Sequence, residues 1–114
     1  MDYIKNKKNM IEVKTIQEFD DVLKNNDIVL VKIGQEFCGP CRIVEKTMQE
    51  MESDYSDKVA FVLIDAADCE EDLIGDIMTI PVIRLYVGGE QKRQEIGLRT
   101  KEQLKKLLDE EIEN

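Results

Sequence analysis

The chain has 114 residues and a formal charge of −9, from 25 acidic and 16 basic side chains. An acidic surface repels phosphate backbones, which argues against nucleic acid as a partner. No apolar run approaches the roughly 18 residues that a membrane-spanning helix needs, so we expect no membrane insertion.

The length predicts a single domain, and 42% hydrophobic residues predict a globular one. Residues 1–9 lack the apolar segment of a signal peptide, and we expect them to form a flexible arm before a domain at residues 10–114. The chain has three cysteines, so an oxidising compartment would leave one of them unpaired. We therefore expect a cytoplasmic protein, and we expect a monomer.

The first half of the chain predicts two strands and two helices. Residues 10–14 alternate apolar and polar side chains and predict a short edge strand. A capping box at residues 15–18 begins a helix that ends at residues 25–27. The almost continuous apolar run 28–33 predicts a central strand that is buried on both faces. The helix after residue 38 has a predicted inner face made of Ile43, Val44, Thr47, Met48, Met51 and Tyr55.

The second half predicts three more strands. Residues 59–64 form a second buried strand, and the acidic segment 68–76 is predicted to be a short helix with Asp68 as a possible cap. Residues 82–87 form the next strand, and the returning antiparallel strand covers residues 91–96. The hairpin turn between these two strands and the capping box of the last helix are Gly88-Gly89 and Thr100–Gln103.

The predicted order is β-α-β-α-β-α-β-β-α. Strands that alternate with helices indicate an α/β fold in which helices flank both faces of a central sheet. We expect this sheet to be mixed but mostly parallel, with the final hairpin as an antiparallel edge.

Cys38 and Cys41 lie between a predicted strand and a predicted helix, with Gly39 and Pro40 between them. The N-terminus of a helix offers unpaired N–H groups and a partial positive charge, which stabilise a thiolate. We therefore interpret the pair as a dithiol redox site, with Cys38 as the exposed nucleophile and Cys41 as the group that attacks the mixed disulfide. The alternatives are a zinc half-site or two unrelated buried cysteines. A zinc site needs more ligands, and the chain offers only Cys69 and no histidine.

Two motifs forty residues apart resemble the thioredoxin family. Residues 37–41 read Phe-Cys-Gly-Pro-Cys and resemble that family's Trp-Cys-Gly-Pro-Cys, with Phe37 in place of Trp. Residues 79–82 read Thr-Ile-Pro-Val and resemble its Ile-Pro-Thr motif. The Gly-Gly turn at 88–89 and Gly97 also fall where the family has a hairpin turn and a glycine, and the similarity covers residues 10–112.

The resemblance implies a thioredoxin fold and a protein disulfide reductase whose redox-active group is the Cys38–Cys41 disulfide, without a bound cofactor. It implies that the bond between Ile80 and Pro81 is cis, that Pro81 faces the cysteines, and that the backbone of Ile80 pairs with the substrate. An ordinary trans proline is the alternative. The implied partners are a thioredoxin reductase as electron donor and disulfide-containing proteins as substrates. The other implied substrate-binding residues are Phe37, Gly39, Pro40 and Gly97.

Lys32 departs from the family, which usually has a buried aspartate six residues before the first cysteine. Phe61 also stands where the family has a lysine on the neighbouring strand. As a cation beneath Cys41, Lys32 would favour the thiolate and make the redox couple more oxidising. As a neutral amine it could act as a base, or it could extend to solvent past Gly34 and do little.

Two other functions therefore stay open. The chain could be an oxidant or isomerase of the same fold with a potential altered by Lys32, or a binding module without turnover. Cys69 lies among acidic residues, which oppose its ionisation, so we expect an unreactive thiol. Arg84, inside a predicted strand, either marks a strand end near solvent or pairs with an acid that the sequence does not identify.

Overall fold

The computed structural model describes residues 10–113, and the expected arm at residues 1–9 lies outside the described residues. The order of helices and strands is the predicted one. The strands are β1 (Met10–Glu12), β2 (Ile28–Gly34), β3 (Val59–Asp65), β4 (Val82–Val87) and β5 (Glu90–Ile96). The helices are α2 (Ile16–Asn25), α3 (Gly39–Tyr55), α4 (Glu71–Ile74) and α5 (Lys101–Glu113).

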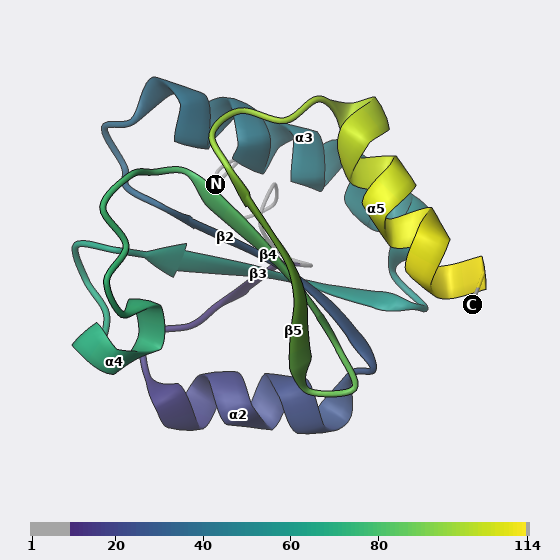
Figure 1. The fold of residues 1–114 in the computed structure, drawn as a ribbon, viewed down its shortest axis with the longest axis horizontal. Helices are drawn as coiled ribbons and strands as arrows, with labels where there is room; N and C mark the ends of the chain where they lie inside the picture. Colours follow the sequence, from purple (N-terminus) through teal and green to yellow (C-terminus); the bar gives the residue numbers. More distant parts are fainter. Residues whose placement is uncertain (1–9, 114) are drawn as a thin grey trace, which may run out of the picture.

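The strands form one mixed sheet in the order β1-β3-β2-β4-β5, so the predicted mixed sheet is confirmed. β3 pairs in parallel with β1 and with β2, whereas β4 is antiparallel to β2 as well as to β5. The pairing of β4 with β2 follows from the short α4. Parallel strands are usually joined by a helical crossover, and in the connection of residues 66–81 only the four residues of α4 are helical, too few to carry the chain back along the sheet. β4 consequently starts at the end where β3 finishes (Figure 1).

Helices cover both faces of the sheet, as the sequence predicted. α3 and α5 lie on one face, and α2 and α4 lie on the other (Figure 1). Along β2, Leu30 belongs to the core under α3 and α5, while Val29 and Val31 belong to the core under α2. This alternation is the two-residue period of a strand, and it explains why every residue of β2 is buried. Within residues 10–113, no helix combines the length and the apolar character that a membrane crossing requires.

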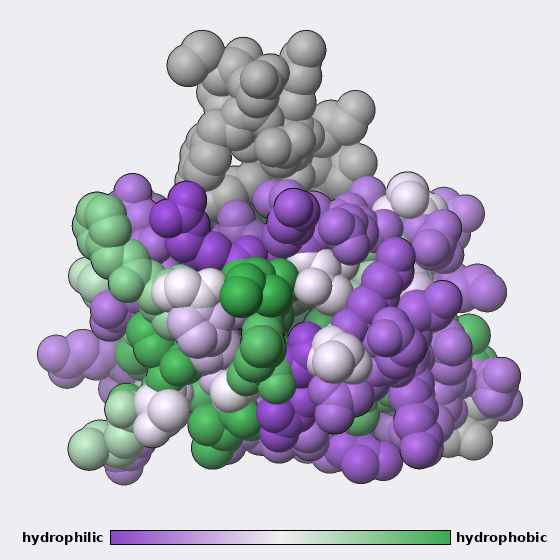
Figure 2. Space-filling model, turned by 90° about the horizontal axis from the view of Figure 1, so that it is seen from above, coloured by the Kyte–Doolittle hydropathy of each residue, from purple (hydrophilic) through white to green (hydrophobic). Residues whose placement is uncertain are grey.

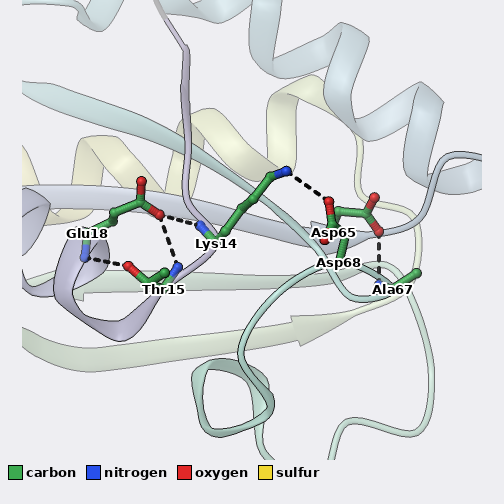
Figure 3. A network of polar contacts seen from close by, with 6 residues as sticks. All are labelled: Lys14, Thr15, Glu18, Asp65, Ala67 and Asp68. Carbon is green, nitrogen blue, oxygen red and sulfur yellow. Dashed lines mark hydrogen bonds and ion pairs between the residues drawn. The ribbon is translucent and has the colours of Figure 1, made fainter.

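The capping box that begins α2 is present and is extended by a second contact (Figure 3). The Thr15 hydroxyl accepts the Glu18 N–H at 3.1 Å, and the Glu18 carboxylate accepts the N–H groups of Thr15 and Lys14. The Lys14 ammonium donates to Asp68 at 2.8 Å. The prediction of Asp68 as a helix cap was therefore wrong: α4 begins after Glu70, and Asp68 instead pairs with a lysine from the β1–α2 connection.

Candidate active site

Cys38 and Cys41 are joined by a disulfide at the first turn of α3. Cys38 is the N-cap residue, and its Sγ accepts the Cys41 N–H at 3.2 Å. Pro40 occupies the first turn, where a missing N–H leaves no helix bond unmade. Cys38 is half-exposed, whereas Cys41 is fully buried. A sulfur from another molecule can therefore reach Cys38 and not Cys41.

Gly34, at the end of β2, leaves the space that Cys41 fills. A Cβ atom at Gly34 would lie 2.8 Å from Cys41 Sγ and 2.9 Å from Cys41 Cβ. Neither distance is compatible with ordinary van der Waals contact. The second cysteine is thus packed directly against the backbone of the central strand.

Lys32 lies in the same space, next to Gly34 and Cys41. Its Cε is 3.4 Å from the place that a Gly34 Cβ would take, and its side chain is only 7% exposed. Lys32 Nζ donates to Glu45 Oε1 on α3 at 3.0 Å. The alternative in which Lys32 extends to solvent was therefore wrong. Glu45 was not singled out from the sequence, although its position four residues after Cys41 is a signal that could have found it.

The segment around Pro81 lies at the same end of the sheet as the disulfide. Val82 pairs with Ile33, so Pro81 stands beside the strand end that leads to Cys38. The Ile80–Pro81 bond is cis in the structure. The Pro81 carbonyl accepts the Gly97 N–H at 2.8 Å. Gly97 has φ +92°, a conformation that favours glycine, and this contact fixes the end of β5 beside Pro81.

Large hydrophobic side chains are exposed on the segments that surround Cys38. Phe37 is 92% exposed and Met78, two residues before Ile80, is 94% exposed. Figure 2 shows hydrophobic surface toward the left, the end at which α3 begins, whereas the right-hand part is mostly hydrophilic. Besides Phe37, the exposed large hydrophobic residues on α3 and on the segments next to Pro81 and Gly97 are Ile43, Met78, Ile96 and Leu98, and none of them was predicted as a site residue. The prediction of Ile43 for the inner face of α3 was wrong, because its side chain is 53% exposed.

Cys69 is a half-buried free thiol. Burial raises its pKa, and the carboxylates of Asp65, Asp68 and Glu70 raise it further. A raised thiol pKa agrees with the expected low reactivity, although burial contributes more to it than the neighbouring carboxylates named from the sequence. Among residues 10–113, no group of three or more His, Cys, Asp or Glu side chains could hold a metal ion.

The Arg84 side chain extends from β4 to the neighbouring edge strand β5. Its Nε donates to the Gln94 side chain on β5 at 2.8 Å, and a longer contact of 3.5 Å joins Nη2 to the Ile74 carbonyl. The partners of this guanidinium are therefore an amide and a carbonyl rather than the acid considered from the sequence.

A pair of cysteines that forms a disulfide at the start of a helix, one reachable and one buried, defines a thiol–disulfide oxidoreductase. The Thioredoxin family model matches residues 10–110. This chain accordingly belongs to the thioredoxin family.

Individual relatives agree with this assignment. The thioredoxin of Alicyclobacillus acidocaldarius is 32% identical over 95 residues, which cover 82% of this chain and 90% of that protein. The bifunctional thioredoxin reductase/thioredoxin of Mycobacterium leprae is 29% identical over 106 residues, 91% of this chain and 23% of that protein. Among solved structures, a mutant thioredoxin from Halobacterium salinarum superposes with a TM-score of 0.82 at 27% identity, covering 90% of this chain and 89% of that one.

Proposed function

We propose that this protein reduces the disulfide bonds of other proteins. The observation that carries the proposal is the unequal exposure of the two sulfurs at the start of α3. The Cys38 thiolate attacks one sulfur of a substrate disulfide, forms a mixed disulfide and releases the first substrate thiol. Cys41 then attacks Cys38 Sγ, forms the Cys38–Cys41 disulfide and releases the second substrate thiol.

The substrate lies on the hydrophobic surface around Cys38. Phe37, Gly39 and Pro40 are exposed beside the nucleophile. We propose that the backbone of Ile80 pairs with the substrate chain, with Pro81 and Gly97 completing the contact. Apolar residues beside the substrate cysteine would bury the exposed side chains of this surface, which favours binding.

The pair has to be reduced again after each turnover, and we propose a thioredoxin reductase as the electron donor. The reductase/thioredoxin fusion named among the relatives supports such a pairing. We propose that the reaction uses no resident cofactor and takes place in the cytoplasm.

An oxidant or isomerase is the second candidate function, because a lysine lies beside Cys41. The charge of Lys32 is balanced by Glu45, however, so the pair exerts little net field on a thiolate. Equilibration with glutathione separates the candidates: a reductase is expected near about −270 mV and a strong oxidant near about −120 mV. The Lys32→Asp variant reports how much of the measured potential depends on this lysine.

Reduction of insulin, followed by turbidity with a dithiol donor and then with a thioredoxin reductase and NADPH, tests the main proposal. We expect turnover by the wild type and by Cys69→Ser, and none by Cys38→Ser. A wild-type protein without turnover would contradict the proposal. A partner bound equally well by wild type and by the Cys38→Ser/Cys41→Ser variant would then favour a binding module.

A further inference from the structure

The second step of the proposed reaction needs a proton acceptor for Cys41. This thiol has to lose its proton before its sulfur can attack the mixed disulfide, since the thiolate is the nucleophile. Cys41 is fully buried, so bulk water does not reach it directly in this structure. A protein group beside the thiol is therefore needed to take the proton.

Glu45 is placed to be that group. It follows Cys41 by four residues on α3, so the two side chains lie on the same face of the helix, about 5–6 Å apart at Cβ. Helical side chains lean toward the N-terminus, which directs Glu45 toward the turn that holds Cys41. The Glu45 side chain is 20% exposed, so it can pass a proton on to solvent.

Lys32 fixes the carboxylate in this position. Its Nζ bonds to Glu45 Oε1 at 3.0 Å, and its Cε lies against the space over Gly34 that Cys41 fills. A protonated lysine has three donors and no acceptor, so the carboxylate is the member of the pair that can accept a proton. Lys32 is the only charged residue that is buried within residues 10–113.

Other charged groups occur on the elements that pack against α3. Asp65 on β3 accepts the Ala67 N–H, and Asp109 on α5 accepts the Tyr55 hydroxyl. The charged residues that share the sheet row of Lys32 are Glu12 on β1 and Glu95 on β5, and those within four positions of Glu45 on α3 are Arg42 and Lys46. None of these is the residue that Lys32 holds beside Cys41.

We propose that Glu45, held by Lys32, accepts the Cys41 proton during resolution of the mixed disulfide. The S–H bond of Cys41 breaks, its proton passes to a Glu45 carboxylate oxygen, and the thiolate forms a bond to Cys38 Sγ. The bond from Cys38 Sγ to the substrate sulfur breaks, and the substrate leaves as a thiolate. Glu45 later releases the proton to solvent. The inference rests on the proposed function. In it, Glu45 is the proton-transfer residue for Cys41, and Lys32 is a positioning residue.

The two steps can be followed separately with the aromatic disulfide DTNB. Reduced protein in a Cys69→Ser background releases one equivalent of the coloured thiol when Cys38 attacks, and a second when Cys41 resolves the mixed disulfide. We expect Glu45→Gln to slow the second phase by about 100-fold or more at pH 7, since general-base effects are typically about 10²- to 10⁴-fold, and to leave the first phase unchanged. The second phase should also need a higher pH to reach half of its maximum rate.

The variant Lys32→Met/Glu45→Leu tests whether the ion pair serves only to stabilise the fold. It leaves no unpaired buried charge, so we expect it to fold. We expect this variant to resolve as slowly as Glu45→Gln and Glu45→Asp to recover part of the rate. The exposed ion pair of Lys14 and Asp68 provides a matched control, and we expect Lys14→Gln/Asp68→Asn to resolve the mixed disulfide at the wild-type rate. A second phase at the wild-type rate in Glu45→Gln or in Lys32→Met/Glu45→Leu would overturn the inference. A second phase faster than wild type in Glu45→Gln would also overturn it, and would show that the Lys32 charge is what activates Cys41. A missing first phase in the wild type would instead contradict the proposed function.

Discussion

The space available at single residues decides how closely the second cysteine approaches the sheet. Gly34 lies against Cys41 and Gly39 lies between the two cysteines in the sequence, and the two glycines differ in what a side chain would meet. A Cβ at Gly34 would collide with Cys41, whereas a Cβ at Gly39 would meet nothing within 4 Å. Gly34 therefore has a steric role that Gly39 lacks.

We expect Gly34→Ala to lower the free energy of unfolding by about 1–3 kcal/mol, because the helix start has to move away from β2. Gly39→Ala is the matched control and should leave stability unchanged or raise it slightly, since alanine favours the helix. Urea unfolding of the oxidised proteins measures both. Equal midpoints for the two variants would show that Cys41 can shift without cost.

Tyr55 joins the end of α3 to α5. Its hydroxyl donates to Asp109 at 2.7 Å, and burial together with this carboxylate raises the tyrosine pKa from 10.0 to about 12. Below pH 10 the tyrosine is neutral in the folded and the unfolded states. Between pH 10 and 12 only the unfolded state loses the proton, so stability falls as the pH rises through this window.

We expect the wild type to lose about 2 kcal/mol more than Tyr55→Phe between pH 9 and pH 12, from roughly two pKa units. Urea unfolding of both proteins across this range measures the difference, and the other titrating groups are common to both. Parallel stability curves would show that the Asp109 contact does not persist in solution.

At the scale of elements, α2 depends on the contacts at its first turn. Thr15 and Glu18 satisfy N–H groups that a helix start otherwise leaves without partners. Thr15→Ala should cost about 1 kcal/mol of stability. Asp20→Ala, on the exposed side of the same helix, should change stability by less than about 0.5 kcal/mol. A Thr15→Ala variant as stable as this control would show that the cap is replaced by water.

Most elements could be predicted because each carries its own local signal. The apolar run of β2 and the capping boxes of α2 and α5 depend only on neighbouring residues, and both boxes are present. The direction of β4 could not be predicted in this way. It depends on how far residues 66–81 carry the chain, and their pattern did not reveal that only four residues are helical.

The site was predictable where spacing alone defines it and not where contacts between elements define it. The cysteine pair at the start of α3 follows from its motif. The Lys32–Glu45 contact does not, because it depends on which turn of α3 faces β2. Ile43 shows the same limit: the buried stripe follows the four-three-four spacing of Val44, Met48, Met51 and Tyr55, and Ile43 lies one position outside it.

At the scale of the whole molecule, the charge of −9 should select among substrates. We expect a peptide disulfide flanked by lysines to be reduced several-fold faster at low salt than one flanked by glutamates. The ratio should fall toward one as salt rises, since the screening length shortens from about 30 Å at 0.01 M to about 3 Å at 1 M. A peptide with neutral flanks is the control, and a ratio independent of salt would contradict an electrostatic origin.

The sheet ends in two edges that differ in length. Within residues 10–113, β1 has three residues and β5 has seven, with Glu90, Lys92, Arg93 and Glu95 among them. A second copy that docked along β5 would have to take these charged side chains out of water. The charges on β5 therefore oppose edge-to-edge pairing of strands between copies. The protein can expose a hydrophobic surface at one end without forming fibres through its sheet edge.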